Sequence, residues 1–418
     1  MNLLVKNIVH EGRKTNIYIE ENTIKSVGGK SGIKDDLVID GEGKAAIPGL
    51  VNAHTHAAMT LMRGYADDLE LHDWLENYIW PLETKLNSDD VYWGAKLACL
   101  EMIKSGTTCF NDMYWHPLST AKALKEMGLR GVISGVFIDL HDPEKAREQK
   151  SVNKKLFTEF KQFPDRIIYS LGPHAAYTVS EESLIWARDF AEKNNLLIHF
   201  HLSETRKENE DFVKKEGLRP IPYLEKIGFL RPNVVCAHAV WVTKGELKTL
   251  AKYNVKVVHN PTSNMKLATG GVMPYVEMKN EGLTVALGTD GCSSNNNLDM
   301  FEEMKFAALL QKAHRWDQTV LPAGEALAMA TEQGAKALGV NTGKIEEGRL
   351  ADIVLIDLRR PELTPHYNLA SDLVYSANGS CVDTVICDGK VLMQNGKVEG
   401  EEEILEKVGV VAKELISR

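Results

Sequence analysis

The feature that most constrains the fold is an alternation, repeated about eight times, of short apolar segments and longer segments with helical spacing. Apolar strands that alternate with helices indicate a parallel sheet covered by helices. Eight such units over about 300 residues predict an α/β fold, a TIM-type (β/α)8 barrel. The expected strands are AIPGLVNA, GTTCFNDM, RGVISGVF, RIIYSLGP, LLIHFHLS, NVVCAHA, NVKVVHN and LTVALGTD.

The two ends of the chain differ from this middle part. Residues 1–48 indicate short strands separated by Gly, Asn and Asp turns, and the same texture returns after residue 348. We expect residues 1–48 and 349–400 to form one small β-sandwich-like domain beside a catalytic barrel of residues 49–348. The helical spacing of residues 401–418 predicts a terminal helix.

Composition narrows the classes of partner. The net charge is −9 and no tract of Lys and Arg is present, so we expect no nucleic-acid partner. No segment is apolar over the length of a membrane span or of a signal peptide, so we expect a cytoplasmic protein with no membrane partner. The six cysteines are scattered and form no CxxC pair, which argues against a disulfide framework.

Histidines and acidic residues stand at the ends of the expected strands. In barrels of this type the active-site residues lie at the carboxyl ends of the strands. The sequence therefore predicts a site at this end of the barrel. The candidates are His54, His56, His174, His201, Glu204, His238, His259 and Asp290.

His54 and His56 are separated by one residue. On a strand this spacing places both imidazoles on one face, where both can reach a single metal ion. Two unrelated histidines in the core or on the surface would show the same spacing. Because the pair directly follows an apolar strand, we interpret both residues as candidate metal ligands.

His201 and Asp290 are the other candidate ligands. His199 could point inward instead, but His201 lies nearer the strand end and is followed by Glu204. Asp290 could be an ordinary turn or cap residue, whereas in a histidine-rich site it would balance charge and accept a proton from water. Three imidazoles and one carboxylate suit one divalent metal, zinc or iron(II), and leave a position for water, as in catalytic sites.

These motifs resemble the amidohydrolase superfamily: PGLVNAHTH (48–56), HLSE (201–204), AHA (237–239) and GTDG (288–291). Further stretches resemble its 5′-methylthioadenosine/S-adenosylhomocysteine deaminase branch, which includes 5′-deoxyadenosine deaminases. They are HTHAAMTLMRGYADDLELHDWL (54–75), IWPLE (79–83), GPHAAYT (172–178), HNPTSNMKLATGG (259–271) and GTDGCSSNNNLDMFEEM (288–304). No lysine ends the fourth strand, so the resemblance implies one metal, bound by His54, His56, His201 and Asp290.

The resemblance also implies roles for the remaining positions. His238 would orient the attacking water, Glu204 would carry protons to the purine ring, and Asp290 would share in proton transfer and face the substrate. Glu83 would bind the ribose hydroxyls, and His174 would contact the nucleoside. Without the resemblance, Glu83 would be interpreted as an ordinary glutamate at a helix start.

The expected reaction is hydrolytic deamination of the adenine ring of 5′-deoxyadenosine, 5′-methylthioadenosine, S-adenosylhomocysteine or adenosine. The products would be the inosine analogue and ammonia. A homocysteine carboxylate usually requires an arginine, and the region after the third strand offers only Arg147, while Arg130 precedes that strand. We therefore expect uncharged 5′ groups to be preferred.

Two other functions stay open at this point. A related hydrolase of a free base or triazine ring, such as a guanine or cytosine deaminase or a chlorohydrolase, would share the metal chemistry without needing Glu83. A non-catalytic scaffold would lack metal ligands, yet all four ligands and Glu204 are present. The resemblance further implies a homo-oligomer whose partner is a small nucleoside.

Overall fold

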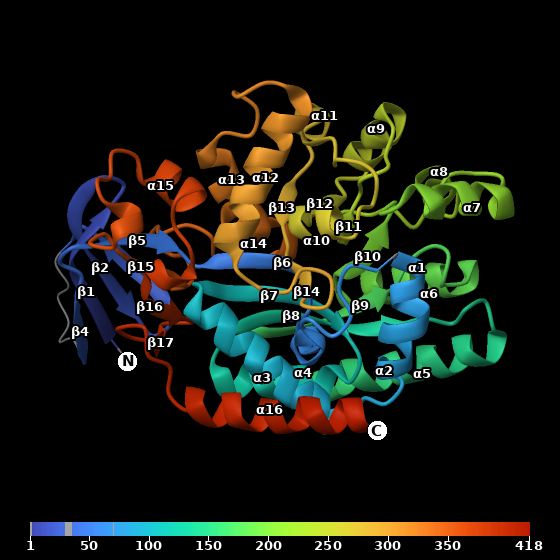
Figure 1. The fold of residues 1–418 in the computed structure, drawn as a ribbon, viewed down its shortest axis with the longest axis horizontal. Coiled ribbons are helices and arrows are strands. Elements are labelled where there is room, and N and C mark those ends of the chain that lie inside the picture. Colours follow the sequence, from blue (N-terminus) through green and yellow to red (C-terminus); the bar gives the residue numbers. More distant parts are fainter. Residues whose placement is uncertain (1, 30–35, 70) are drawn as a thin grey trace.

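The computed structural model describes residues 2–29, 36–69 and 71–418, which form two sheets and the helices that surround the larger one (Figure 1). The larger sheet lies in the middle of the molecule, and the smaller one lies to its side, where strands from the first 48 residues pair with strands from residues 353–393. Within the described parts of the chain, none of the helices is both long and apolar enough to cross a membrane.

The larger sheet is a closed parallel barrel. Its order is β13-β12-β11-β10-β9-β8-β7-β6-β14, and because β13 and β14 are separated by only two residues, the sheet returns to β6 and closes. Each of the eight predicted strands is found. The strands are β6 (Leu50–His56), β7 (Thr107–Tyr114), β8 (Arg130–Phe137), β9 (Ile167–Pro173), β10 (Ile198–Leu202), β11 (Val234–His238), β12 (Lys256–His259), β13 (Val285–Leu287) and β14 (Asp290–Gly291).

Helices cover the outside of this barrel, and local signals set their ends. Asn87 caps the helix Ser88–Lys104 and forms a capping box with Asp90. Gly128, with φ 82°, ends the helix Pro117–Met127. The longer helices are α3 (Ser88–Lys104), α4 (Pro117–Met127), α5 (Pro143–Glu159), α6 (Glu181–Asn194), α7 (Arg206–Glu216), α9 (Lys244–Lys252) and α12 (Met300–Arg315). The shorter ones are α1 (Leu71–Trp74), α2 (Trp80–Glu83), α8 (Pro220–Lys226), α10 (Pro261–Lys266), α11 (Tyr275–Asn280), α13 (Ala323–Met329), α14 (Glu332–Leu338) and α15 (Leu369–Tyr375).

The second sheet combines strands from the first 48 residues with strands from residues 353–393. Its path is β17-β16-β15-β5-β1-β2-β3, with β4 paired to β1, and the antiparallel pairing of β5 with β15 places Ile47 opposite Val354. The strands are β1 (Asn2–His10), β2 (Arg13–Glu20), β3 (Thr23–Val27), β4 (Leu37–Asp40), β5 (Lys44–Pro48), β15 (Ile353–Asp357), β16 (Val382–Cys387) and β17 (Lys390–Met393). The domain boundaries at residues 48, 349 and 401 stay predictions.

The first predicted barrel strand, AIPGLVNA, is in fact two strands. Its first residues belong to β5 of the small sheet and its last residues to β6 of the barrel, with Gly49 between them. A Cβ at Gly49 would lie 2.1 Å from Thr108 Oγ1, so the chain can pass between the two sheets only without a side chain at this position. The apolar run continues across the junction because both strands are buried, which hid the break.

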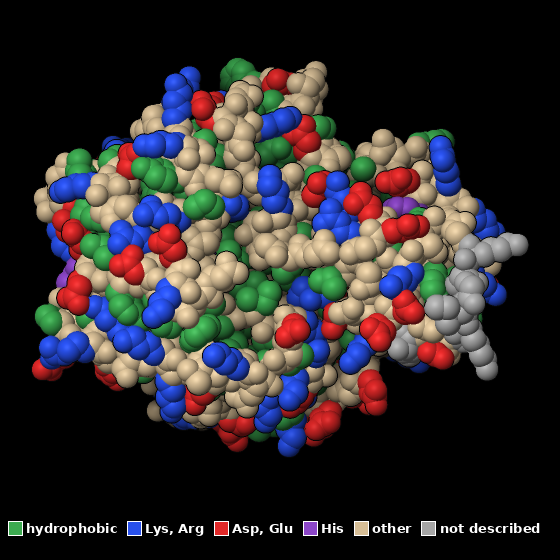
Figure 2. All heavy atoms as spheres, turned by 180° about the vertical axis from the view of Figure 1, so that it is seen from behind, with side chains coloured by type: hydrophobic (Ala, Val, Ile, Leu, Met, Phe, Trp, Pro, Cys, Tyr) green, Lys and Arg blue, Asp and Glu red, His purple; other side chains and the backbone are tan. Residues whose placement is uncertain are grey.

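The terminal helix α16 (Glu401–Ser417) packs along α3 at the lower edge of the molecule (Figure 1). Its apolar side is buried, and Arg418 after it bonds the buried carboxylate of Asp90. On the face drawn in Figure 2, acidic and basic side chains are interspersed among the described residues and form no patch of one sign.

Candidate metal centre and active site

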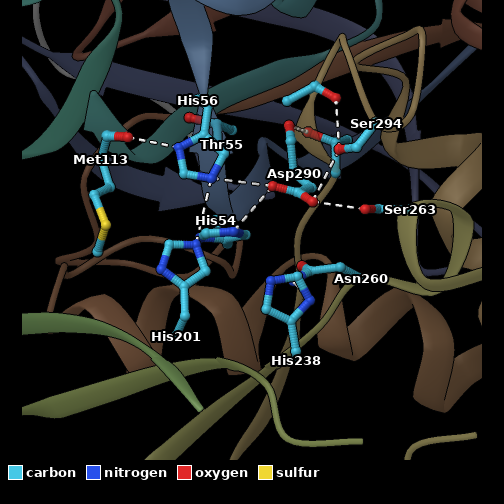
Figure 3. A network of polar contacts seen from close by, with 12 residues as sticks. His54, Thr55, His56, Met113, His201, His238, Asn260, Ser263, Asp290 and Ser294 are labelled. Atoms are coloured by element: carbon cyan, nitrogen blue, oxygen red, sulfur yellow. Dashed lines mark hydrogen bonds and ion pairs between the residues drawn. The ribbon is translucent and has the colours of Figure 1, made fainter. Parts of the chain in front are cut away.

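The carboxyl ends of the barrel strands bring together a cluster of histidines around one aspartate (Figure 3). Parallel strands all end on the same side of the barrel, so residues far apart in the sequence meet there. The pairing of β14 with β6 places Asp290 opposite Thr55, between the two histidines of the HxH pair. The members of the cluster are His54, His56, His201, His238 and Asp290.

The distances within this cluster are those of residues that share one ion. Asp290 Oδ1 lies 3.2 Å from Nε2 of His54 and 3.2 Å from Nε2 of His56. His201 Nε2 lies 3.4 Å from His56 Nε2, and one ligand atom each from His54, His201 and His238 falls within 4.8 Å of the others. The side-chain nitrogen and oxygen atoms of these residues thus face one common centre.

The arrangement of ring nitrogens fits a cation. His56 Nδ1 lies 2.6 Å from the Met113 carbonyl and His201 Nδ1 lies 3.1 Å from the His174 carbonyl, so each Nδ1 donates. In the neutral rings both Nε2 atoms then carry lone pairs that face each other. His54 Nε2 is buried and faces Asp290 Oδ1. Three imidazoles and one carboxylate thus converge as zinc or iron(II) requires.

The charge states of the histidines follow from burial and from Asp290. Burial lowers the pKa of His54 to about 4 and that of His201 well below its usual value, so both rings are neutral at pH 7, as metal binding requires. Burial also lowers the pKa of His56, but hydrogen bonding to Asp290 and its charge outweigh burial and raise this pKa to about 9. Metal binding must therefore displace a proton from His56.

Asp290 is held in place by two hydroxyl groups. Ser263 Oγ and Ser294 Oγ donate to Asp290 Oδ2 at 2.6 and 2.9 Å, which leaves Oδ1 facing the histidines. Burial raises the pKa of Asp290, but hydrogen bonds and charge interactions with His54 and His56 keep it well below its usual value. Asp290 is therefore an anion, as a charge-balancing ligand must be.

Two glycines explain why the GTDG motif has this form. A Cβ at Gly288 would lie 2.8 Å from both Cβ and N of His54, and one at Gly291 would lie 2.5 Å from Met59 Sδ and 3.2 Å from His56 Cβ. The last strand of the barrel can therefore approach β6 closely only with glycines on both sides of Asp290. Asp290 itself has a left-handed φ of 65°.

Glu204 lies beside His238 of this cluster. His238 Nε2 is 3.8 Å from Glu204 Oε2, and His238 Nδ1 faces the side-chain amides of Asn260 and Asn264 at 3.2 and 3.0 Å. Burial lowers the pKa of His238 to about 4. Burial, and after it the charge of Asp290, raise the pKa of Glu204 to about 8. At neutral pH Glu204 thus retains a proton that it can donate.

A cavity of about 730 Å³ opens over this cluster, a size that suits a small organic ligand. Glu83, Glu204 and His174 line it together with His56, His201, His238 and Asp290 of the cluster. Its aromatic walls are Trp74, Trp80, Tyr114, Trp115 and Tyr177. Among the described residues, no lysine or arginine lines the cavity.

Glu83 lies in the cavity wall formed by α2. Burial raises the pKa of Glu83, and the neighbouring Tyr114 and Trp115 offset part of this increase. His174 lies at the end of β9, where its Nδ1 contacts Thr178 Oγ1 at 2.9 Å. Both residues are thus within the space that would hold a substrate.

The structure does not bring Arg147 to this cavity. Arg147 is on α5, where its side chain is 73% exposed and pairs with Glu144. Arg130 is buried at the amino end of β8, the opposite end of the barrel from the site, and binds Asp352 with Nε–Oδ2 2.8 Å. Neither arginine can therefore meet a ligand in this cavity.

Several residues of the site carried no clear signal in the sequence. His199, set aside in favour of His201, is buried, and its Nε2 lies 2.7 Å from His54 Nδ1, so it orients that imidazole. Tyr114, the last residue of β7, and Trp115 after it line the cavity without any signal in the sequence. Glu208 lines the cavity, but its spacing from Thr205 signals only the start of a helix.

A closed parallel barrel with a buried His/Asp cluster at the carboxyl ends of its strands defines the class of metal-dependent barrel hydrolases. The comparisons agree with this class. The chain belongs to the amidohydrolase family, because a sequence model of that family matches residues 45–392.

Similar proteins are known from archaea and bacteria. The chain is 50% identical over 407 residues to a 5′-deoxyadenosine deaminase of Methanothermobacter thermautotrophicus, with 96% of this chain and 95% of that protein covered. It is 49% identical over 403 residues to a 5-methylthioadenosine/S-adenosylhomocysteine deaminase of Archaeoglobus fulgidus, with the same coverage. A zinc-bound adenosine deaminase of Xanthomonas campestris superposes with a TM-score of 0.93 at 31% identity, over 100% of this chain and 98% of that one.

Proposed function

We propose that this protein is a metal-dependent aminohydrolase that removes the 6-amino group of 5′-modified adenosines. The observation that carries the proposal is a single cavity that holds the metal cluster, the protonated carboxyl of Glu204 and the separate carboxyl of Glu83. The first two groups suit hydrolysis of a ring C–N bond, and the third suits a ribose. The names of the two archaeal relatives support the same substrate class.

The protein groups have distinct parts in this reaction. A divalent metal, when bound here, lowers the pKa of a water molecule to about 7 and so supplies a nucleophile at neutral pH. His238 hydrogen-bonds to the attacking water and orients it toward C6. Glu204 donates its proton to N1, so that negative charge does not accumulate on the ring.

Proton transfers then complete the reaction. Asp290 takes one proton from the water and passes it to the amino group, which leaves as ammonia when the C6–N bond breaks. Glu204 takes the proton of the new C6 hydroxyl as the carbonyl forms, and is thereby restored. The products are the inosine analogue and ammonia, and His54, His56 and His201 stay in place as ligands.

The ribose and the 5′ group are recognised by the rest of the cavity. Glu83 accepts hydrogen bonds from the vicinal ribose hydroxyls, and His174 contacts the nucleoside. Because the described lining contains no lysine or arginine, a homocysteine carboxylate meets no cation there. Uncharged 5′ groups, as in 5′-deoxyadenosine, 5′-methylthioadenosine and adenosine, are therefore preferred over that of S-adenosylhomocysteine.

The metal in this proposal is zinc, which the Xanthomonas adenosine deaminase contains. The donor set accepts iron(II) as well. A homo-oligomer stays a prediction from the resemblance, as does a location in the cytoplasm.

The test is ammonia release by zinc-loaded protein with 5′-deoxyadenosine, 5′-methylthioadenosine, S-adenosylhomocysteine, adenosine, adenine, guanine and cytosine, together with chloride release from a chloro-triazine. We expect turnover of the adenosines, little turnover of the free bases, and loss of activity on chelation that zinc restores. Turnover confined to a free base or to the triazine would refute the role of Glu83 and favour the alternative hydrolases.

A further inference from the structure

The carboxylate of Glu208 holds the backbone segment that carries Glu204. Glu208 Oε1 accepts the Ser203 N–H at 3.0 Å, and Oε2 accepts the Glu204 N–H at 2.7 Å. Ser203 has a left-handed φ of 49°, which an L-residue adopts at a cost unless its surroundings hold it there. Both oxygens of one side chain are thus used to fix the turn between β10 and α7.

This arrangement differs from the ordinary helix caps of the same chain. In the capping box of α9, Glu246 Oε2 accepts the N–H of the N-cap residue Thr243 at 2.7 Å. At the start of α7 the N-cap Thr205 accepts the Glu208 N–H at 3.0 Å, as a cap does. The Glu208 carboxylate faces the N–H of Thr205 too, but it also bonds the amides of the two residues before the N-cap. Capping the helix does not require that reach.

Glu208 also lies at the site itself, unlike Glu246. It lines the same cavity as Glu204 and His238, whereas Glu246 does not. Burial, and after it the nearby charge of Glu204, raise the pKa of Glu208 to about 7. Placing a partly buried carboxyl next to another carboxyl destabilises the charged form of both groups. Helix stability alone therefore does not explain why Glu208 stands at this position.

We propose that Glu208 is a positioning residue for Glu204: it fixes the Ser203–Glu204 backbone so that the Glu204 carboxyl stays directed at the cavity beside His238. This inference rests on the proposed role of Glu204 as proton donor. Small displacements of a catalytic group are expensive, because a shift of about 1 Å costs roughly a hundredfold in rate.

The test compares Glu208→Gln with the matched cap variant Glu246→Gln. A glutamine keeps the size of the side chain but has one acceptor oxygen, so one of the two amide bonds is lost. We expect Glu208→Gln to lower kcat for adenosine about 10- to 100-fold, with KM changed less than about twofold and zinc content unchanged. Glu246→Gln likewise leaves one acceptor oxygen for two donors, the N–H of Thr243 and Nε of Arg219, and should leave kcat per zinc-loaded enzyme unchanged.

A double-mutant cycle with Glu204→Gln separates positioning from a structural role. If Glu208 acts through Glu204, then Glu208→Gln has no further effect on the residual rate of Glu204→Gln. Equal losses in both backgrounds, or an unchanged kcat in Glu208→Gln, overturn the proposal. Glu208→Asp keeps the charge and should retain more activity than the glutamine variant, and it serves as the second variant if Glu208→Gln does not fold.

A measurement without substrate keeps this inference distinct from the proposed function. Hydrogen exchange followed by mass spectrometry reports the amides of Ser203 and Glu204 directly. We expect faster exchange there in Glu208→Gln and not in Glu246→Gln. If wild-type protein turns over none of the adenosines, the proposed function fails, while unchanged exchange at these two amides refutes the positioning role by itself.

Discussion

At the scale of single residues, the same burial acts in opposite directions on the groups of this site. It raises the pKa of Glu204 and lowers the pKa of His54 and His201, because burial disfavours whichever form is charged. Burial therefore contributes most to keeping Glu204 protonated and His54 and His201 neutral. Asp290 stays charged because hydrogen bonds and the charges of its histidine neighbours outweigh burial.

The first prediction concerns the pH dependence of turnover. Glu204 must hold its proton to act as an acid, so kcat/KM for adenosine should fall about tenfold per pH unit above the pKa of Glu204. That pKa is raised to about 8, and a metal held by Asp290 offsets part of the increase that Asp290 causes, so the fall should begin at or somewhat below this pH. A pH–rate profile tests this, and a profile that stays flat up to pH 10 would contradict it.

The second prediction concerns recognition of ribose by Glu83. Glu83→Gln should lower kcat/KM for adenosine about 10- to 100-fold, because a hydrogen bond to a charged group contributes roughly 1.5–3 kcal/mol. Steady-state kinetics with 2′,3′-dideoxyadenosine provide the matched control. This substrate lacks the hydroxyls, so wild type and variant should handle it alike, and a further loss in the variant would argue against the assigned contact.

At the scale of elements, the site depends on how closely the last strand of the barrel approaches the first. The pairing of β14 with β6 joins Asp290 to the HxH pair, and Gly288 provides the space for it. A helix on the outside of the barrel tolerates far more variation, since its side chains can turn toward solvent. The GTDG motif is thus required for the packing of β14 against β6 as much as for the chemistry of Asp290.

The third prediction is that Gly288→Ala weakens metal binding. The new methyl group would lie 2.8 Å from His54 Cβ and from His54 N, so the ligand must shift. We expect at least about a tenfold higher Kd for zinc, in line with the effect of disturbing groups that orient a ligand. Competition with a zinc chelator measures this Kd.

The control for this variant is Gly324→Ala in α13. A Cβ there meets nothing within 4 Å, and alanine is accommodated in a helix. Zinc affinity should be the same as in wild type. Equal affinity in both variants would show that the close approach at Gly288 does not govern the metal site.

At the scale of the whole molecule, a buried ion pair joins the barrel to the second sheet. Arg130 of β8 makes two hydrogen bonds to Asp352, which precedes β15, and a third to Asp388, with N–O distances of 2.8 to 3.1 Å. Arg130 and Asp352 are both buried. The amino end of the barrel is therefore devoted to structure, and the carboxyl end to chemistry.

The fourth prediction is that Asp352→Ala destabilises the protein without changing its chemistry. Removing Asp352 leaves the buried Arg130 charge with only one partner, the partly exposed Asp388, which costs up to about 3–5 kcal/mol. Urea unfolding should show this loss, while kcat of the folded variant stays near wild type because the pair lies at the opposite end from the site. Asp357→Ala breaks the exposed pair with Arg359 and should cost less than about 1 kcal/mol. Similar losses in the two variants would contradict the assignment.

Much of the architecture was predictable because it rests on local pattern. Every barrel strand shows as an apolar run, and the residues of the metal cluster lie at the ends of those runs. The break at Gly49 was not predictable, because strands on both sides of it are buried and look continuous. Glu208 was missed for a related reason, since its spacing from Thr205 is that of an ordinary helix start.

The arginines show the limit of sequence reasoning most clearly. Arg147 was the candidate for a substrate carboxylate and Arg130 was the other arginine near the third strand, yet Arg130 is buried in an ion pair at the far end of the barrel and Arg147 is exposed on a helix. Arg130 is kept from the cavity because it stands at the start of its strand, and Arg147 because it lies on the outer face of its helix. Neither is visible until the elements are placed in space.

The sequence by itself determined the strand and helix pattern, the barrel class and the residues at the strand ends, because hydrophobic periodicity and turn residues act over a few neighbours. Only the tertiary structure decided which ring nitrogen of each histidine faces the centre, which carboxyl keeps its proton and which charges line the cavity. Those properties arise from burial and from contacts between segments distant in the chain, such as Asp290 against His54 and His56. They exist only once the barrel has closed.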